Sequence, residues 1–157
     1  MPVGPAGPAT PEELDAFTDL VDRWARAELA RPGGQVLAVD RDPDLRRWYV
    51  RIRGEAKLVT TVWLTLRQRT LHVEAYFMPG PEENVAECFD YLLRTNNRLY
   101  GLRFALGAEE AIYLVGQVPL AALDEVELDR VVGAAYAYSE ECFASAMSIG
   151  YASKFRR

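Results

Sequence analysis

Two consecutive stretches of the chain, residues 57–67 and 70–78, alternate apolar and polar side chains with a period of two. This alternation is typical of β-strands that are buried on one face only. A turn at Gln68 and Arg69 would place Leu66 opposite Leu71, Leu64 opposite Val73, Val62 opposite Ala75 and Thr60 opposite Phe77. Opposed residues share a face, and a slip of one residue would destroy the agreement. The pattern therefore predicts an antiparallel hairpin in this register.

The hairpin would have one apolar face and one mixed face. The apolar face would consist of Leu58, Thr60, Val62, Leu64, Leu66, Leu71, Val73, Ala75 and Phe77. The mixed face would consist of Val59, Thr61, Trp63, Thr65, His72, Glu74, Tyr76 and Met78. The apolar face is expected to form part of the core.

The remaining elements follow from helical spacing, turn residues and caps. Thr10, Pro11 and Glu13 form the signature of a helix start, and a helix is predicted over 11–30. Strands are predicted over 35–41 and 46–54, a helix over 82–99 with Val85 on its inner stripe, strands over 102–106 and 111–118, and a helix over 124–150 that begins at Asp124. The order is α-β-β-β-β-α-β-β-α, which predicts an α+β domain with two layers, an antiparallel sheet packed by helices.

Several motifs in the second half of the chain resemble a known family. They include Leu92-Leu93-Arg94-Thr95-Asn96, then Tyr100-Gly101, then Val115-Gly116-Gln117-Val118-Pro119-Leu120. Over roughly 35–155 the chain resembles YbjN-domain proteins, which are bacterial and share the fold of type III secretion chaperones. The resemblance implies a regulator or chaperone-like adaptor that is homodimeric and binds a protein partner. It implies no catalytic residue, and the turn at 107–110 departs from the family pattern.

Length and composition limit the alternatives. A chain of 157 residues predicts a single domain over 11–157, after a disordered Pro/Gly-rich tail over 1–10. No apolar run approaches the length of a membrane span, and the first residues lack the features of a secretory signal, so we expect a cytoplasmic protein. The net charge of −5 argues against general affinity for nucleic acid.

The sequence carries little that suggests catalysis. His72 is the only histidine, and we interpret it as a cross-strand neighbour of Thr65. Cys88 and Cys142 lie on inner helix stripes, where cysteine behaves as a small apolar residue. The acidic pairs at 82–83, 109–110 and 140–141 are interpreted as solvated surface, and no phosphate-binding glycine loop is present. We therefore expect no enzyme activity, no metal and no cofactor.

The candidate site is the mixed face of the sheet. Arg47, Tyr49, Arg51 and Arg53 lie on one side of the strand at 46–54, and Trp63 and Tyr76 lie on one side of the hairpin. Tyrosine, tryptophan and arginine are enriched at protein interfaces. We predict that Trp63, Tyr76, Tyr49, Arg51 and Arg53 contact a protein partner.

Three alternatives remain open from the sequence. The long helix at 124–150 could cover this face, so that Trp63 belongs to the core. Arginines interleaved with aromatic rings could instead bind single-stranded nucleic acid, although Arg51 and Arg53 could equally pair with carboxylates such as Glu74. A small-ligand binder or an enzyme with an unrecognised pocket is the third alternative.

Overall fold

The first helix begins where its capping residues predict. In the computed structural model, which describes residues 7–155, α1 spans Pro11–Ala30. The hydroxyl of Thr10 accepts the N–H of Glu13, and the carboxylate of Glu13 accepts the N–H of Thr10. Residues 1–6 of the predicted tail lie outside the described residues, whereas Ala9 is buried and its N–H donates to the carbonyl of Gln68 at 2.7 Å.

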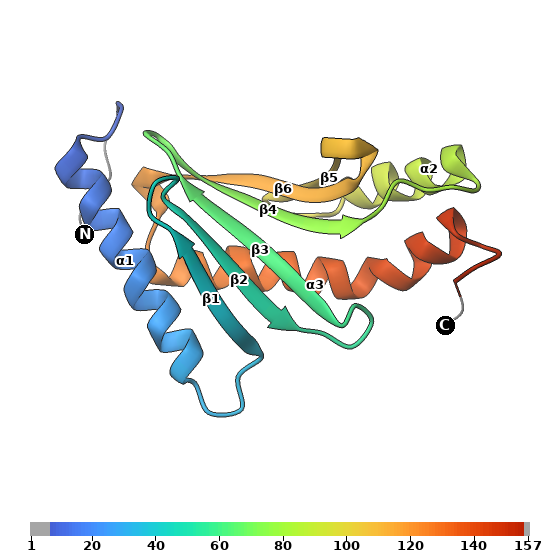
Figure 1. Ribbon diagram of the computed structural model, residues 1–157. Coiled ribbons are helices and arrows are strands. Elements are labelled where there is room, and N and C mark those ends of the chain that lie inside the picture. Colours follow the sequence, from blue (N-terminus) through green and yellow to red (C-terminus); the bar gives the residue numbers. More distant parts are fainter. Residues whose placement is uncertain (1–6, 156–157) are drawn as a thin grey trace.

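Within the described residues, six antiparallel strands form one sheet, in the order β1-β2-β3-β4-β6-β5. The strands are β1 (Val36–Asp42), β2 (Arg47–Arg53), β3 (Val59–Leu66), β4 (Thr70–Met78), β5 (Leu102–Leu106) and β6 (Ile112–Pro119). Only β6 is inserted out of sequence, between β4 and β5 (Figure 1). The α+β fold class and the order of the main elements are therefore confirmed.

The central hairpin has the register that the alternation predicts. Leu66 lies opposite Leu71, Leu64 opposite Val73 and Val62 opposite Ala75, and the pairing ends there, before the predicted pair of Thr60 and Phe77. Two residues near its open end differ from the prediction. Leu58 is 81% exposed because it lies in the loop before β3, and Met78 is fully buried because a bulge after Tyr76 shifts the register of β4.

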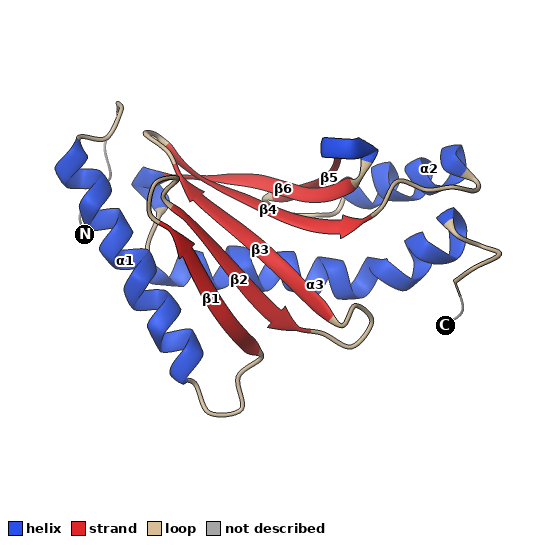
Figure 2. Ribbon diagram, viewed as in Figure 1, coloured by secondary structure: helices blue, strands red, loops and turns tan. Residues whose placement is uncertain are grey.

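All three helices pack on one side of the sheet. The third helix, α3 (Glu125–Gly150), runs behind the strands in the view of Figure 2, and α1 and α2 (Val85–Asn96) lie toward opposite ends of the sheet. The indole of Trp48 on β2 points to this side and donates to Asp22 of α1 at 2.8 Å. On the same side the ring of Phe77 on β4 packs against Phe143 of α3. The predicted two-layer arrangement is confirmed.

The helix limits differ from the predicted ones mainly in α2. This helix is shorter than the predicted 82–99, and Val85 is 43% exposed at its start rather than on the inner stripe. Cys88 and Leu92 are buried as expected. At the start of α3, Asp124 accepts the N–H of Glu127 at 2.8 Å, so the predicted cap is confirmed.

The turn at 107–110 is irregular. It contains a short 3₁₀ segment, η1 (Ala108–Glu110), in which Glu109 and Glu110 have φ angles of 58° and 60°. Positive φ angles favour glycine or asparagine, so two glutamates here are unusual. A second 3₁₀ segment, η2 (Leu120–Ala122), links β6 to α3.

Candidate functional site

The side of the sheet turned away from the helices, called here the open face, carries the aromatic residues that the sequence singles out. Tyr49 on β2 lies directly opposite Trp63 on β3. Their ring centroids are 5.2 Å apart and the rings meet edge to face. The guanidinium of Arg47 lies 5.0 Å from the centroid of Trp63 and donates to Thr65 at 2.8 Å. These contacts hold Trp63 in one orientation while 38% of it stays exposed.

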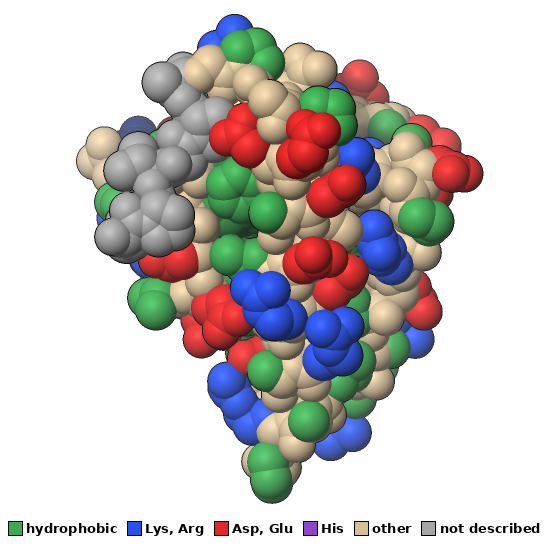
Figure 3. Space-filling view, turned by 90° about the vertical axis from the view of Figure 1, so that its left-hand side faces the viewer, with side chains coloured by type: hydrophobic (Ala, Val, Ile, Leu, Met, Phe, Trp, Pro, Cys, Tyr) green, Lys and Arg blue, Asp and Glu red, His purple; other side chains and the backbone are tan. Residues whose placement is uncertain are grey.

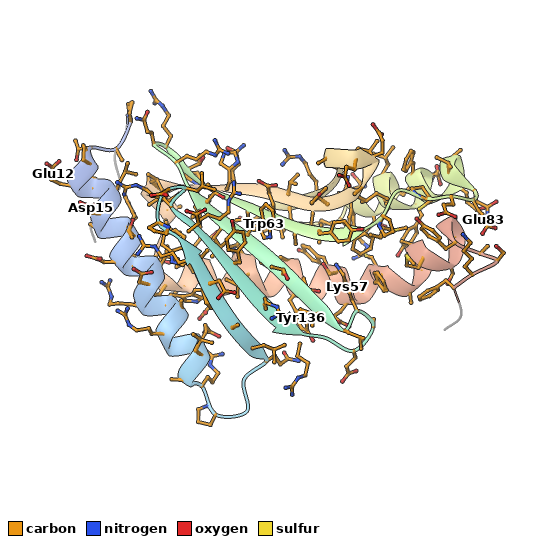
Figure 4. All side chains as sticks on the ribbon, in the orientation of Figure 1. Glu12, Asp15, Lys57, Trp63, Glu83 and Tyr136 are labelled. Carbon is orange, nitrogen blue, oxygen red and sulfur yellow. The ribbon has the colours of Figure 1, made fainter. Side chains whose placement is uncertain are left out.

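No helix covers Trp63 in the described part of the chain. Figure 4 shows its side chain on the side of the sheet that faces the viewer, while α3 passes behind the strands. The interpretation in which the third helix covers this face is therefore wrong, because α3 packs against the alternate residues of the same strands.

Tyr76 belongs to a second aromatic pair. It lies opposite Tyr113 on β6, with ring centroids 5.6 Å apart and an edge-to-face geometry. The ammonium group of Lys57 lies 5.1 Å from the centroid of the Tyr76 ring and donates a hydrogen bond to the Tyr76 carbonyl. Burial lowers the pKa of Lys57 to about 8, although the carboxylate of Glu140 acts in the opposite direction. The face therefore carries two aromatic pairs, each with a cation over one ring.

The position of Lys57 depends on a contact from α3. The carboxylate of Glu140 accepts the N–H groups of Glu55 and Ala56 at 3.0 and 2.7 Å, which fixes the loop between β2 and β3. Gly54 begins this loop, and a Cβ there would meet Glu140 at 1.9 Å and the Lys57 carbonyl at 2.2 Å. Glu140 is thus part of the structural support of the loop rather than solvated surface.

Arg51 and Arg53 extend the open face along β2. Both alternate with the buried Val50 and Ile52, and both are exposed. Among residues 7–155 neither arginine has a carboxylate within ion-pair distance, so the predicted alternative of pairing with Glu74 is wrong. Arg51, Arg53, Tyr49, Trp63 and Tyr76 therefore share one face, with Tyr49 touching Trp63 and Tyr76 in a separate pair.

Three residues of the open face were missed by the sequence reasoning. Tyr113 and Arg103 reach it through the pairing of β6 with β4 and of β5 with β6. Their alternation was visible, but their register was not, since it depends on which strand lies next to which. Lys57 lies in a loop and gave no signal of its own.

The groups that could act in catalysis are poorly suited to it. His72 lies opposite Thr65 as predicted, and burial together with Arg67 lowers its pKa, while Glu74 acts in the opposite direction. Burial raises the pKa of Cys88 and Cys142, which keeps both as neutral thiols with little nucleophilic character. Residues 7–155 contain no group of histidines, cysteines and carboxylates placed to hold a metal ion.

A polar pocket of about 300 Å³ lies on the helix side of the sheet, between α1, α3 and β1. Trp24 donates to Asp129 at 2.6 Å, and Gln35 donates to the hydroxyl of Tyr136 at 3.0 Å. Burial raises the pKa of Glu28, with smaller contributions from Asp129, while Arg31 acts against it. These side chains are already partnered with one another, so the pocket presents few polar groups for a ligand.

An apolar groove of about 290 Å³ lies between α2 and β5. Leu93 and Leu106 on its rim are 67% and 51% exposed. The side-chain amide of Asn96 donates to the carbonyl of Phe104 at 3.1 Å and accepts its N–H at 2.7 Å. Asn96 therefore occupies backbone groups of β5 that another strand would otherwise use for pairing.

Comparison with known proteins agrees with this geometry. The model of the YbjN family, described as "Putative bacterial sensory transduction regulator", matches residues 28–146. Uncharacterized proteins of Mycobacterium tuberculosis and Mycobacterium leprae are 35% and 34% identical over 127 and 116 residues, or 81% and 73% of this chain. The chain spans about 64% and 63% of the length of these two relatives.

Three solved structures with the same fold are complexes between two proteins. The ExsC-ExsE complex matches with a TM-score of 0.56 at 18% identity, covering 80% of this chain and 92% of that one. The HopA1-SchA chaperone-effector complex matches with a TM-score of 0.59 at 11% identity, covering 84% of this chain and 96% of that one. The Yersinia pestis type III secretion chaperone SycH, in complex with a fragment of YscM2, matches with a TM-score of 0.53 at 16% identity. The match covers 78% of this chain and 96% of that one. At these identities the likeness shows the fold alone.

Within residues 7–155, no helix has the length and apolar character needed to cross a membrane.

Proposed function

The chain belongs to the YbjN family, and we propose that it works without catalysis, as a chaperone-like or regulatory adaptor that binds a partner protein on the open face. One observation carries the proposal: Trp63 and Tyr76 stay 38% and 42% exposed on a sheet face that no described helix covers. Exposed aromatic side chains held in fixed orientations provide contact area at a small entropic cost.

The solved neighbours support binding of a protein. Each of the three is a complex of a protein of this fold with another protein, and two of them contain a protein named as a chaperone. The fold by itself does not assign a function, so the support rests on the combination with the aromatic open face.

Affinity capture from the native host, followed by mass spectrometry, tests the proposal. The baits are the wild-type chain, Trp63→Asp and the control Val126→Asp, which changes an apolar residue that is 76% exposed on α3. We expect a dominant protein that is captured by wild type and control and lost with Trp63→Asp. Circular dichroism must show that Trp63→Asp is folded. Equal capture by all three baits would place the binding surface elsewhere and contradict the proposal.

We further propose that two copies of the chain form a homodimer through the groove between α2 and β5. The groove is lined by uncharged side chains: Phe89, Leu92, Leu93, Asn96, Phe104, Ala105, Leu106 and Ile112. A two-fold interface brings each residue near its own copy, so a charge-free lining avoids repulsion between like charges. Light scattering should give the mass of a dimer for wild type and Trp63→Asp, and of a monomer for Leu93→Asp. A monomeric wild type, or a dimeric Leu93→Asp, would contradict this assignment.

A further inference from the structure

The lysines and arginines of residues 7–155 divide into two groups by location. Those that form ion pairs with carboxylates are Arg23, Arg31, Arg41, Arg46, Arg94, Arg98, Arg130 and Lys154. In every case the carboxylate belongs to a helix or to the segment before α2. Figure 3 shows the α1 side of the molecule, where acidic and basic side chains lie beside one another.

The cations without such a partner gather on the sheet. Within residues 7–155 they are Arg26 of α1 and a set on or beside the open face: Arg47, Arg51, Arg53, Lys57, Arg67, Arg69 and Arg103. The acidic groups near this set are few. Asp40 lies opposite Tyr49, Asp42 opposite Arg47 and Glu74 opposite Trp63, and Glu109 lies close enough to Tyr76 to affect its pKa. A chain with a net charge of −5 therefore presents a locally positive face.

We propose that the open face binds an acidic segment of the partner protein, in which carboxylates flank an aromatic or aliphatic side chain. This inference rests on the proposed function and names the chemistry of its partner. The carboxylates would pair with Arg51 and Arg53 on β2 and with Lys57 over the Tyr76 ring on β4, near the loop between β2 and β3. The apolar side chain would pack on Trp63 and Tyr76.

Lys57 is suited to this role by its surroundings. It is partly buried, it donates to a carbonyl, and the carboxylate whose charge acts on it, Glu140, already accepts the N–H groups of Glu55 and Ala56. A carboxylate from a partner would compensate a charge that burial disfavours. Removing a partner from a charge in a partly desolvated site weakens binding more than removing one on an exposed rim.

The same geometry disfavours nucleic acid as the partner. Base stacking requires a free ring face. Arg47 lies over the ring of Trp63 and Lys57 over that of Tyr76, and each ring also meets a tyrosine edge to face. Glu74 and Asp40 lie beside the central pair, where a continuous phosphate backbone would pass close to them. A peptide can space its carboxylates to avoid these positions.

The experiment uses the full chain and a random dodecapeptide library displayed on phage. Selection is carried out on wild type and on Trp63→Asp, and enriched peptides are synthesised for titration by fluorescence anisotropy. We expect peptides with a net negative charge and at least one aromatic or large aliphatic residue. Arg51→Glu and Arg53→Glu should each weaken their binding by about tenfold or more, and Arg26→Glu should leave it unchanged. Affinity should fall as NaCl rises from about 50 to about 500 mM.

The other outcomes separate this inference from the proposed function. Peptides without excess acidic residues, still lost with Trp63→Asp, would overturn the inference and leave the function standing. Peptides that bind Trp63→Asp as well as wild type would overturn both. Tighter binding of an oligothymidylate of matching length, lost in Arg51→Glu, would identify nucleic acid instead. A fall in the light-scattering mass of Arg51→Glu would identify a second copy of the chain as the occupant.

Discussion

The two faces of the sheet are built from the same strands and differ in almost every other respect. Trp48 and Trp63 lie on neighbouring strands, one residue out of line with each other in the pairing of β2 with β3. Trp48 is 1% exposed against the helices, whereas Trp63 is 38% exposed on the open face. Each indole makes a defined contact, Trp48 with Asp22 and Trp63 with Tyr49 and Arg47. A fixed side-chain orientation alone therefore does not distinguish a buried core residue from an exposed residue that is free to bind a partner.

The two faces of the sheet also differ in how their positively charged side chains are paired. On the helix side the described cations other than Arg26 form ion pairs within the chain, as with Arg41 and Asp22. On the open face Arg51 and Arg53 have no such partner among the described residues. If the comparison is correct, substitutions on the helix side should change stability, and substitutions on the open face should change binding.

The largest expected difference is between the two tryptophans. Trp48→Ala should lower the free energy of unfolding by about 3–5 kcal/mol, because it leaves a cavity and removes one of the two partners of Asp22. Trp63→Ala should lower it by about 1 kcal/mol, the worth of its aromatic and cation contacts. Urea denaturation of the two variants measures both values. Equal losses would mean that Trp63 belongs to the core and would end the distinction between the faces.

A smaller loss is expected at the loop that joins the two faces. Gly54→Ala should lower the free energy of unfolding by about 2 kcal/mol, because the new Cβ overlaps Glu140 and the Lys57 carbonyl. Gly133→Ala on α3 is the matched control, since nothing lies within 4 Å of its Cβ position. It should raise stability by about 0.5–1 kcal/mol through helix propensity. Thermal or urea unfolding distinguishes the two, and a harmless Gly54→Ala would contradict the close packing of the loop.

Lys57 should make the free energy of unfolding depend on pH. Its pKa is about 8 in the folded protein, below the ordinary 10.5, so the unfolded chain binds the proton more tightly. The lowered pKa therefore destabilises the folded protein by its full amount below pH 8. This destabilisation decreases as the pH rises from 8 toward 10.5. Lys57→Met, which keeps the apolar stem, should therefore gain about 1 kcal/mol at pH 7 after allowance for the exposure of Lys57.

The measurement compares urea unfolding of wild type and Lys57→Met at several pH values. The gain in the free energy of unfolding should shrink between pH 8 and pH 10. Titration of the buried cysteines affects both proteins equally, so it cancels in the difference between them. A difference that is constant over this range would show that Lys57 keeps an ordinary pKa.

The smallest effects are expected from the exposed arginines. Arg51→Gln and Arg53→Gln should change the free energy of unfolding by less than about 0.5 kcal/mol, since neither has an ion-pair partner in residues 7–155. Arg41→Gln, which loses contacts with Asp22 and the ring of Trp48, should cost slightly more, about 0.5–1 kcal/mol. Thermal melts compare the three variants. A larger loss at Arg51 than at Arg41 would reverse the assignment of the faces.

Alternation, caps and turn residues predicted the main elements because these signals act over a few residues. The register from Leu66 to Ala75 followed from period-two alternation and the length of one turn. The start of α1 followed from Thr10, Pro11 and Glu13, and the hydrogen bonds between Thr10 and Glu13 confirm it. The bulge after Tyr76 was not predicted, because it depends on the pairing of β4 with β6, a strand that is distant in sequence.

The sequence by itself determined that the strands have two unlike faces and, apart from Leu58 and Met78, which residues of the hairpin share each face. Only the tertiary structure decided which face the helices cover, because both faces of β2 and β3 offer side chains against which a helix could pack. It also decided the place of Lys57, since the loop that holds Lys57 is fixed by Glu140, a residue of α3 far along the chain. Local periodicity sets the direction of a side chain, but exposure depends on what distant segments pack against it.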